Sequence, residues 1–299
     1  MPVVKIENAH SRLVETLRRN AFSRLAIMAA CLMAWLIAFR GFAVPALKGL
    51  GTPGSIPGDS ARVIGALIYA AGALLLYRTL VGRIEHRPVV ELARRPGTAH
   101  GLAGFAIGTA LSCTAIGLMW VAGAVHLTGF GDATRLIATF TAAIMASVGE
   151  ELLFRGVLFR ILEQAFGTLA ALLASALLFG LAHIVNPDAT LIGALAIAIE
   201  AGLLLGVAYV VTRNLWFAIG LHLAWNFAQG GIFGPASGRE PHGLVRLAFA
   251  GPDWLTGGTL GVEGSALTVA LCLALAAAFA VLALRRGEWR PAQLKLTLE

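Results

Sequence analysis

The sequence is dominated by long apolar blocks that alternate with short charged segments. Hydrophobic residues make up 58% of the chain and charged residues only 13%, whereas an ordinary soluble domain carries about a quarter charged residues. A helix needs about 20 mostly apolar residues to cross the hydrocarbon core of a bilayer. Because block after block approaches this length, the sequence predicts an all-α fold: a polytopic transmembrane helix bundle with no soluble domain.

The apolar blocks predict about eight membrane spans. They lie at about 25–47, 61–82, 100–124, 134–154, 168–185, 190–212, 214–231 and 265–285. Several contain Gly, Ala and Ser, which membrane helices use for close packing. We therefore expect a cytoplasmic N-terminal segment (1–24), a single transmembrane domain (25–285) with its core at about 134–231, and a cytoplasmic tail (286–299).

The distribution of positive charge predicts the orientation of the chain. Eight crossings put both termini on one side of the membrane. If that side is the cytoplasm, the cytoplasmic segments hold all but six of the 23 Lys and Arg residues, and Arg155 is one of these cytoplasmic residues. Cytoplasmic loops carry this excess in membrane proteins. The net charge of +7 is thus explained without a nucleic-acid partner, and we expect a bacterial inner (plasma) membrane protein. The six outer cations are Arg40, Lys48, Arg62, Arg135, Arg239 and Arg246.

Three clusters of polar residues interrupt the apolar spans. Ionisable groups inside a membrane are costly and mark functional sites by default. The clusters are Glu150-Glu151-Leu-Leu-Phe-Arg155 at the end of the fourth span, Phe179-Gly-Leu-Ala-His183 at the end of the fifth, and His222-Leu-Ala-Trp-Asn226 in the seventh.

Helical spacing within these clusters suggests a role for each side chain. Glu151 and Arg155 are four residues apart, so they share a helix face and can form an ion pair. Glu150 is rotated by about 100° from Glu151 and points elsewhere, away from this cation, as a general base would. His222 and Asn226 also share a face and can donate two N–H groups to one oxyanion.

The predicted topology leaves one conflict. Glu150 lies at the cytoplasmic end of the fourth span, whereas His183 lies near the outer end of the fifth. The two can meet only if the span boundaries shift by a turn or two, or if the fifth segment is tilted and broken, with Asn186-Pro187 closing it. Glu150 paired with Arg160 across a cytoplasmic turn is the structural alternative.

The three clusters resemble the motifs of the CAAX protease and bacteriocin-processing (CPBP) family of intramembrane proteases, also called Abi or type II CAAX prenyl endopeptidase-like. Those motifs are Glu-Glu-x-x-x-Arg, Phe-x-x-x-His and His-x-x-x-Asn, and all three occur intact and in order within about 140–230. The resemblance implies an intramembrane endopeptidase that hydrolyses peptide bonds of membrane-embedded or lipidated peptides and proteins. The first and last spans carry no part of it.

The resemblance also implies a role for each motif residue. Glu150 would activate water, with His183 helping to hold it, and His222 and Asn226 would stabilise the tetrahedral oxyanion. The remaining motif residues, Glu151 and Arg155, would be structural and order the catalytic helix.

A metalloprotease mechanism is the alternative to metal-free catalysis. Glu150, His183 and His222 form a carboxylate-plus-two-histidine set that can bind Zn²⁺. However, no helix carries the His-Glu-x-x-His pair that supplies two ligands and a base together. We favour a site with no metal cofactor.

Two functions of other classes remain open. A non-catalytic immunity or scaffold protein could use the same fold, and a proton-coupled transporter could use intramembrane Glu and His residues as a relay. The intact motifs favour catalysis, and the absence of two matching interrupted halves argues against the transporter. Glu200, in the sixth span, fits none of the motifs, and whether it takes part in the site remains open.

Overall fold

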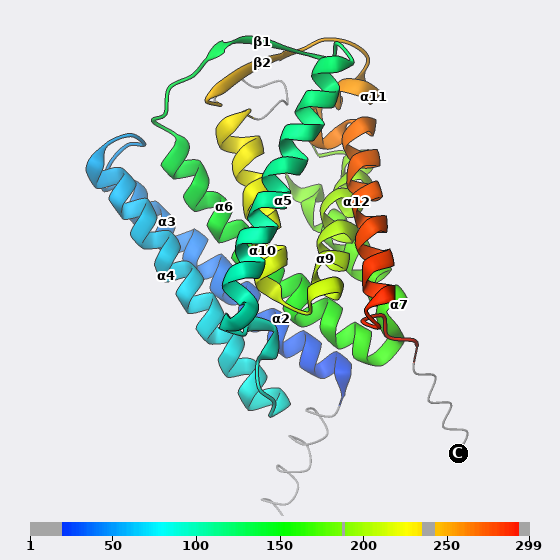
Figure 1. The fold of residues 1–299 in the computed structure, drawn as a ribbon. Coiled ribbons are helices and arrows are strands. Elements are labelled where there is room, and N and C mark those ends of the chain that lie inside the picture. Colours follow the sequence, from blue (N-terminus) through cyan, green and yellow to red (C-terminus); the bar gives the residue numbers. More distant parts are fainter. Residues whose placement is uncertain (1–19, 187–188, 235–242, 293–299) are drawn as a thin grey trace, which may run out of the picture.

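The computed structural model describes residues 20–186, 189–234 and 243–292. Within these ranges the chain is almost entirely helical, with one two-stranded sheet, and the predicted all-α bundle is confirmed (Figure 1). Six helices in this described part of the chain are long and apolar enough to cross a bilayer, as expected of an integral membrane protein. Most of the predicted N-terminal segment, the end of the predicted tail, Pro187 and Arg239 lie outside the described residues.

The first half of the bundle supplies three of the six long helices. They span Ala21–Lys48, Ile56–Glu85 and Arg94–Val121. Their elements are α2 (Ala21–Ala38), η1 (Phe39–Ala43), α3 (Val44–Lys48), α4 (Ile56–Leu80), η2 (Val81–Glu85), η3 (Val90–Leu92) and α5 (Arg94–Val121).

The second half supplies the other three long helices, Leu136–Val185, Leu191–Thr212 and Gly258–Arg285, together with the shorter helix formed by α10 and η7. Its helical elements are α6 (Leu136–Glu151), η4 (Leu152–Phe159), α7 (Arg160–Ala182), η5 (His183–Val185), α8 (Leu191–Ile197), η6 (Ala198–Leu203), α9 (Leu204–Thr212), α10 (Leu215–Phe227), η7 (Ala228–Ile232), α11 (Asp253–Thr256), η8 (Gly258–Gly264) and α12 (Ala266–Arg285). All eight expected spans are therefore helical, although the fourth and fifth form one continuous segment.

The fourth and fifth expected spans are the two arms of a helical hairpin. Its turn is Gly167, with φ 80° and ψ 171°, a conformation that glycine adopts without a steric penalty. Glu150 and His183 are almost equidistant in sequence from this glycine, so at about 1.5 Å per residue each lies about 25 Å from the turn. The Phe154 and Phe179 rings, 4.8 Å apart, pair the two arms.

The hairpin resolves the conflict in the predicted topology. The boundary expected near residue 154 is wrong, because the helix continues to Gly167 and leaves Glu150 in the middle of its arm. The fifth segment ends at Val185, as the sequence suggested, with His183 near its end, and both residues reach the same level of the bundle. The turn therefore determines where the site lies.

We expect Gly167→Ala to destabilise the hairpin. A Cβ there would lie 2.7 Å from the Ala292 backbone nitrogen, and the conformation is strained for any other residue. The cost is about 1–3 kcal/mol of unfolding free energy, measurable as a lower melting temperature in detergent. Gly117→Ala is the matched control, because a Cβ at this helical position meets nothing within 4 Å. Equal melting temperatures for the two variants would contradict this account of the turn.

The start of α2 and the end of α12 lie at the same end of the bundle (Figure 1). Ion pairs gather there: Glu85 contacts Arg160 at 2.8 Å and Arg24 at 3.6 Å. The predicted alternative, in which Arg160 pairs with Glu150, is therefore wrong. Burial alone would raise the pKa of the nearby Glu91 carboxyl, but hydrogen bonds from Arg87 and Tyr77 hold this pKa below its ordinary value.

The opposite end of the bundle carries a small antiparallel sheet that the sequence analysis did not predict. Strand β1 (Val125–Phe130) pairs with β2 (Val245–Phe249), with an irregularity between Leu127 and Gly129. The strands are short and more than a hundred residues apart in the chain, so neither had a local partner that would reveal it. The sheet ties the end of α5 to the long connection before α12.

Candidate active site

The three predicted ionisable residues converge at mid-bundle. Oε2 of Glu150, from α6, lies 4.0 Å from Nε2 of His183 and 3.9 Å from Nε2 of His222. These separations are longer than a hydrogen bond, and polar groups this far apart are commonly bridged by water. Oε2 of Glu150 is buried and has no hydrogen-bond partner within the described part of the chain.

A single cavity joins all four predicted catalytic residues. Glu150, His183, His222 and Asn226 line a space of about 70 Å³. Since a cavity of about 15 Å³ by this kind of measure already holds a water molecule, the space is large enough for water. His222 and Asn226 therefore present the same face of α10 to the site, as their spacing predicted.

Glu151 and Arg155 form a buried ion pair behind the cavity. Both side chains are fully buried, and Nη1 of Arg155 donates to Oε1 of Glu151 at 2.9 Å. The same Oε1 lies 2.9 Å from Nδ1 of His222, a contact that the sequence did not reveal. Arg155, which the charge count placed on the inner side, is therefore part of the core of the site.

Hydrogen bonds at the Nδ1 atoms orient both imidazoles. Nδ1 of His183 lies 2.8 Å from the carbonyl oxygen of Phe179, and a carbonyl can only accept, so this nitrogen carries a proton. Nδ1 of His222 likewise faces Glu151, whose oxygen already accepts from Arg155. In its neutral form each ring then has an acceptor at Nε2, which is the atom that faces Glu150.

π-helical segments border the site on three helices. Segment η4 follows Glu151, η6 contains Glu200, and η7 follows Asn226. Such segments are rare and occur frequently at functional sites, because the wider turn changes the hydrogen-bond pattern of the backbone. Arg155 donates to the carbonyl oxygens of Ala201 and Gly202 at 2.7 and 2.9 Å, so the first motif holds η6 in place.

Two further carboxyl groups, Glu200 and Glu263, line the same cavity. Oε1 of Glu200 is buried and has no partner among the described residues, whereas Oε1 of Glu263 accepts a hydrogen bond from Trp225 Nε1 at 3.1 Å. The position of Glu200 within an apolar span signalled it in the sequence. Glu263 gave no such signal, because it lies in the Gly-rich connection that precedes α12.

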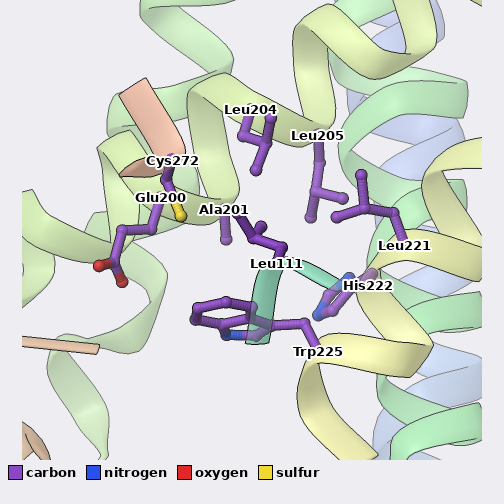
Figure 2. A pocket seen from close by; sticks show the side chains of 9 residues that line it. All are labelled: Leu111, Glu200, Ala201, Leu204, Leu205, Leu221, His222, Trp225 and Cys272. Carbon is purple, nitrogen blue, oxygen red and sulfur yellow. The ribbon is translucent and has the colours of Figure 1, made fainter. Parts of the chain in front are cut away.

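A second, smaller cavity lies beside the first. Its volume is about 20 Å³, and it shares Glu200, His222 and Trp225 with the larger cavity. Figure 2 shows the Trp225 indole between His222 and Glu200, with the Cys272 thiol beside Glu200. Trp225 thus lines both cavities together with His222 and Glu200.

The side chains of the cavity match a zinc site in chemistry but not in spacing. Glu150, His183 and His222 have the right chemistry, and the Nδ1 contacts of the two rings resemble those that orient metal-bound histidines. Ligand atoms about 2.0–2.1 Å from a tetrahedral ion lie about 3.4 Å apart, so the observed 4.0 and 3.9 Å separations would have to shorten. No group of three His, Cys, Asp or Glu side chains within metal-binding distance is found in residues 20–186, 189–234 and 243–292.

A known protein family matches the part of the chain that carries the three motifs. Residues 132–228 match the model of a protein family described as Rce1-like, type II CAAX prenyl endopeptidase Rce1-like. No curated protein and no solved structure matches the chain. The matched segment runs from just before α6 to the end of α10, so it contains all three motifs and excludes α2 to α5 and α12.

Proposed function

Because residues 132–228 match the model of the Rce1-like type II CAAX prenyl endopeptidase family, we propose that this chain is an intramembrane endopeptidase. It hydrolyses peptide bonds of membrane-embedded or lipidated peptides and proteins. The observation that supports this most is the convergence of Glu150 with two imidazole nitrogens, at 4.0 and 3.9 Å, in a cavity large enough for water.

Glu150 is the proposed general base. Its free Oε2 takes a proton from a water molecule that His183 Nε2 helps to hold, and the water oxygen attacks the scissile carbonyl carbon. The C–N bond then breaks, and Glu150 returns the proton to the leaving amine. Because all the positions are fixed by helices, the reacting groups need little reorganisation.

His222 and Asn226 are the proposed oxyanion donors. The Asn226 amide donates directly, and His222 donates from Nε2 when its ring is protonated at both nitrogens. Glu151 lies 2.9 Å from Nδ1 and stabilises that positive charge, while Arg155 donates to the same Glu151 oxygen and orients it. Preorganised donors of this kind commonly contribute the largest part of transition-state stabilisation.

The proposed mechanism uses no metal ion. A Zn²⁺ held by Glu150, His183 and His222 would supply a Lewis acid, but Glu150 would then be a ligand and another base would be required. Glu151 is poorly placed for that role, because its side chain is fully buried and its Oε1 is bound to both Arg155 and His222. Metal analysis of the purified protein tests this directly: stoichiometric zinc that is lost in His183→Ala would overturn the metal-free proposal.

We also propose where in the cell the protein lies and which classes of substrate it cleaves. The chain lies in a bacterial inner membrane with both termini in the cytoplasm, since the arginine-rich end of the bundle is the end that holds the start of α2 and the end of α12. Prenylated C-terminal peptides are one substrate class. Leader peptides and membrane proteins are the others.

Proteoliposomes containing the purified protein test this function. A farnesylated CAAX peptide and a membrane-tethered peptide without a prenyl group are incubated with wild-type protein, His183→Ala and His222→Ala, and cleavage is followed by mass spectrometry. We expect wild-type protein to cleave at least one peptide and neither variant to cleave either. Cleavage at the wild-type rate by a correctly folded histidine variant would overturn the assignment.

Asn226→Ala should retain part of the activity. Loss of one oxyanion donor lowers the catalytic rate by about 10²–10³-fold, and we expect this loss in kcat with little change in KM. The matched control is Gln229→Ala, which removes an amide in the next turn that does not line the cavity. An Asn226→Ala rate equal to that of the control would remove Asn226 from the oxyanion site.

A further inference from the structure

A large cavity lies away from the active site, between α3, α4 and α6. Its volume is about 520 Å³, within the range of 300–1,000 Å³ that small-molecule sites occupy. Its lining residues come from the α3–α4 hairpin and the strand-side half of α6, elements that Figure 1 labels. The cavity lies toward the end of the bundle opposite to the start of α2. This end is the one proposed to be extracytoplasmic.

Three cations line this cavity, and no Asp or Glu does. They are Arg40, Lys48 and Arg62. No salt bridge to any of them is found within the ranges that the structure describes. The cavity therefore has a net charge of +3 and no internal counterion.

The positions of these cations are unusual for a membrane protein. Positive charges collect on the cytoplasmic side, and only six were expected on the outer side. Half of those six line this one cavity. A cluster that runs against the general charge distribution is more consistent with an anionic ligand than with a role in topology.

Arg62 is partly free to bind such a ligand. Nη2 donates to the carbonyl oxygen of Gly51 at 3.3 Å, which anchors the guanidinium. Nη1 is buried and has no partner in the described part of the chain. A guanidinium held by one nitrogen and free at the other is well placed to bind a phosphate oxygen.

The rest of the cavity wall is apolar and extends deeper into the bundle. It includes Gly65 and Ala66 from α4 and Ala142 and Met145 from α6. Lys48 lies at the end of α3 and Arg62 within two turns of the start of α4, which is the level at which headgroups meet the hydrocarbon core. The lining thus carries two cations near the helix ends and a third, Arg40, about two turns deeper in η1 beside the apolar residues.

We propose that this cavity binds an anionic phospholipid from the surrounding bilayer. The phosphate group lies among Arg40, Lys48 and Arg62, and an acyl chain lies along Ala142 and Met145. The bound lipid contacts α6. This helix also carries Glu150, which lies little more than one turn beyond Met145. The site is independent of the proposed peptidase activity and stands or falls on lipid binding alone.

Native mass spectrometry of the protein released from mixed vesicles tests this proposal. Vesicles of phosphatidylglycerol and phosphatidylcholine are used with wild-type protein, Arg40→Gln/Arg62→Gln and the matched control Arg135→Gln/Arg246→Gln, whose residues are exposed outer cations that do not line the cavity. At about 1 kcal/mol per basic residue, the loss of two cations should weaken retention of phosphatidylglycerol by about 30-fold. Wild type and control should retain it equally.

Two additional measurements separate a lipid site from simple charge attraction. Ala142→Phe narrows the apolar part without changing the charge, and it should also lower phosphatidylglycerol retention. Inorganic phosphate at millimolar concentration should not displace the lipid. Equal retention by the cavity variant and the control would overturn the proposal, as would full retention in Ala142→Phe or displacement by phosphate alone. Size-exclusion chromatography confirms that each variant is folded.

Discussion

Replacement of Glu150 by Gln should abolish peptide hydrolysis without disturbing the fold. Gln keeps the shape of the side chain but cannot accept the proton of the attacking water, and loss of a general base lowers a rate by about 10²–10⁴-fold. Oε2 of Glu150 has no hydrogen-bond partner among the described residues, so the substitution breaks no hydrogen bond at this atom. The measurement is kcat/KM in proteoliposomes, together with the melting temperature of each protein.

The matched control for this prediction is Asp132→Asn, which neutralises an exposed carboxylate between β1 and α6. We expect wild-type activity and an unchanged melting temperature. If Glu150→Gln cleaved substrate as fast as this control, Glu150 would not be the base. If Glu150→Gln melted far below wild type, Glu150 would have a structural role that the geometry does not reveal.

Replacement of Arg155 by Met should have the largest effect on stability. Arg155 and Glu151 are both fully buried, and removal of one partner leaves an uncompensated charge in the core. Breaking such a pair costs about 3–5 kcal/mol. The carbonyl oxygens of Ala201 and Gly202 also lose their donor. Thermal unfolding in detergent should show a large drop in melting temperature, with loss of activity following from loss of fold.

The double variant Glu151→Met/Arg155→Met separates stability from catalysis. Replacement of both charges by apolar side chains should recover part of the stability, because no unpaired charge remains. Activity should stay low, because His222 loses the acceptor at its Nδ1. Glu288→Gln, at a more exposed pair with Arg213, is the control and should cost less than about 1 kcal/mol. Full activity in the folded double variant would exclude a positioning role for Glu151.

The residues that gather at the active site could largely be predicted from the sequence. Glu150, His183, His222 and Asn226 are polar groups in apolar surroundings, and their cost in a membrane makes them conspicuous. Spacing of four residues also predicted the Glu151–Arg155 pair and the common face of His222 and Asn226. These inferences needed only the geometry of a single helix.

Contacts between helices could not be obtained in the same way. The contact between Glu151 and His222 joins residues 71 positions apart, and no local pattern encodes it. The hairpin at Gly167 was missed because hydropathy measures how apolar a segment is and not where its helix turns. Glu263 was missed for a similar reason, since its role in the lining of the cavity depends on how the connection before α12 folds back over the bundle.

The expected position of Glu150 shows how a boundary error affects a functional inference. A helix end at residue 154 placed this carboxylate near the cytoplasmic surface, far from His183. The arm actually continues to Gly167, which moves Glu150 to mid-bundle without any change in the local motif. The motifs thus identified the members of the site, and the length of one helix decided whether they met.

Mass spectrometry of peptide termini tests the central claim most directly. Membrane fractions are compared from cells that express wild-type protein, Glu150→Gln or Asp132→Asn at equal levels. We predict a set of new carboxyl and amino termini within or beside membrane segments in wild-type and Asp132→Asn cells, all absent from Glu150→Gln cells. Identical termini in all three would contradict the proposal that these four polar side chains form a peptidase.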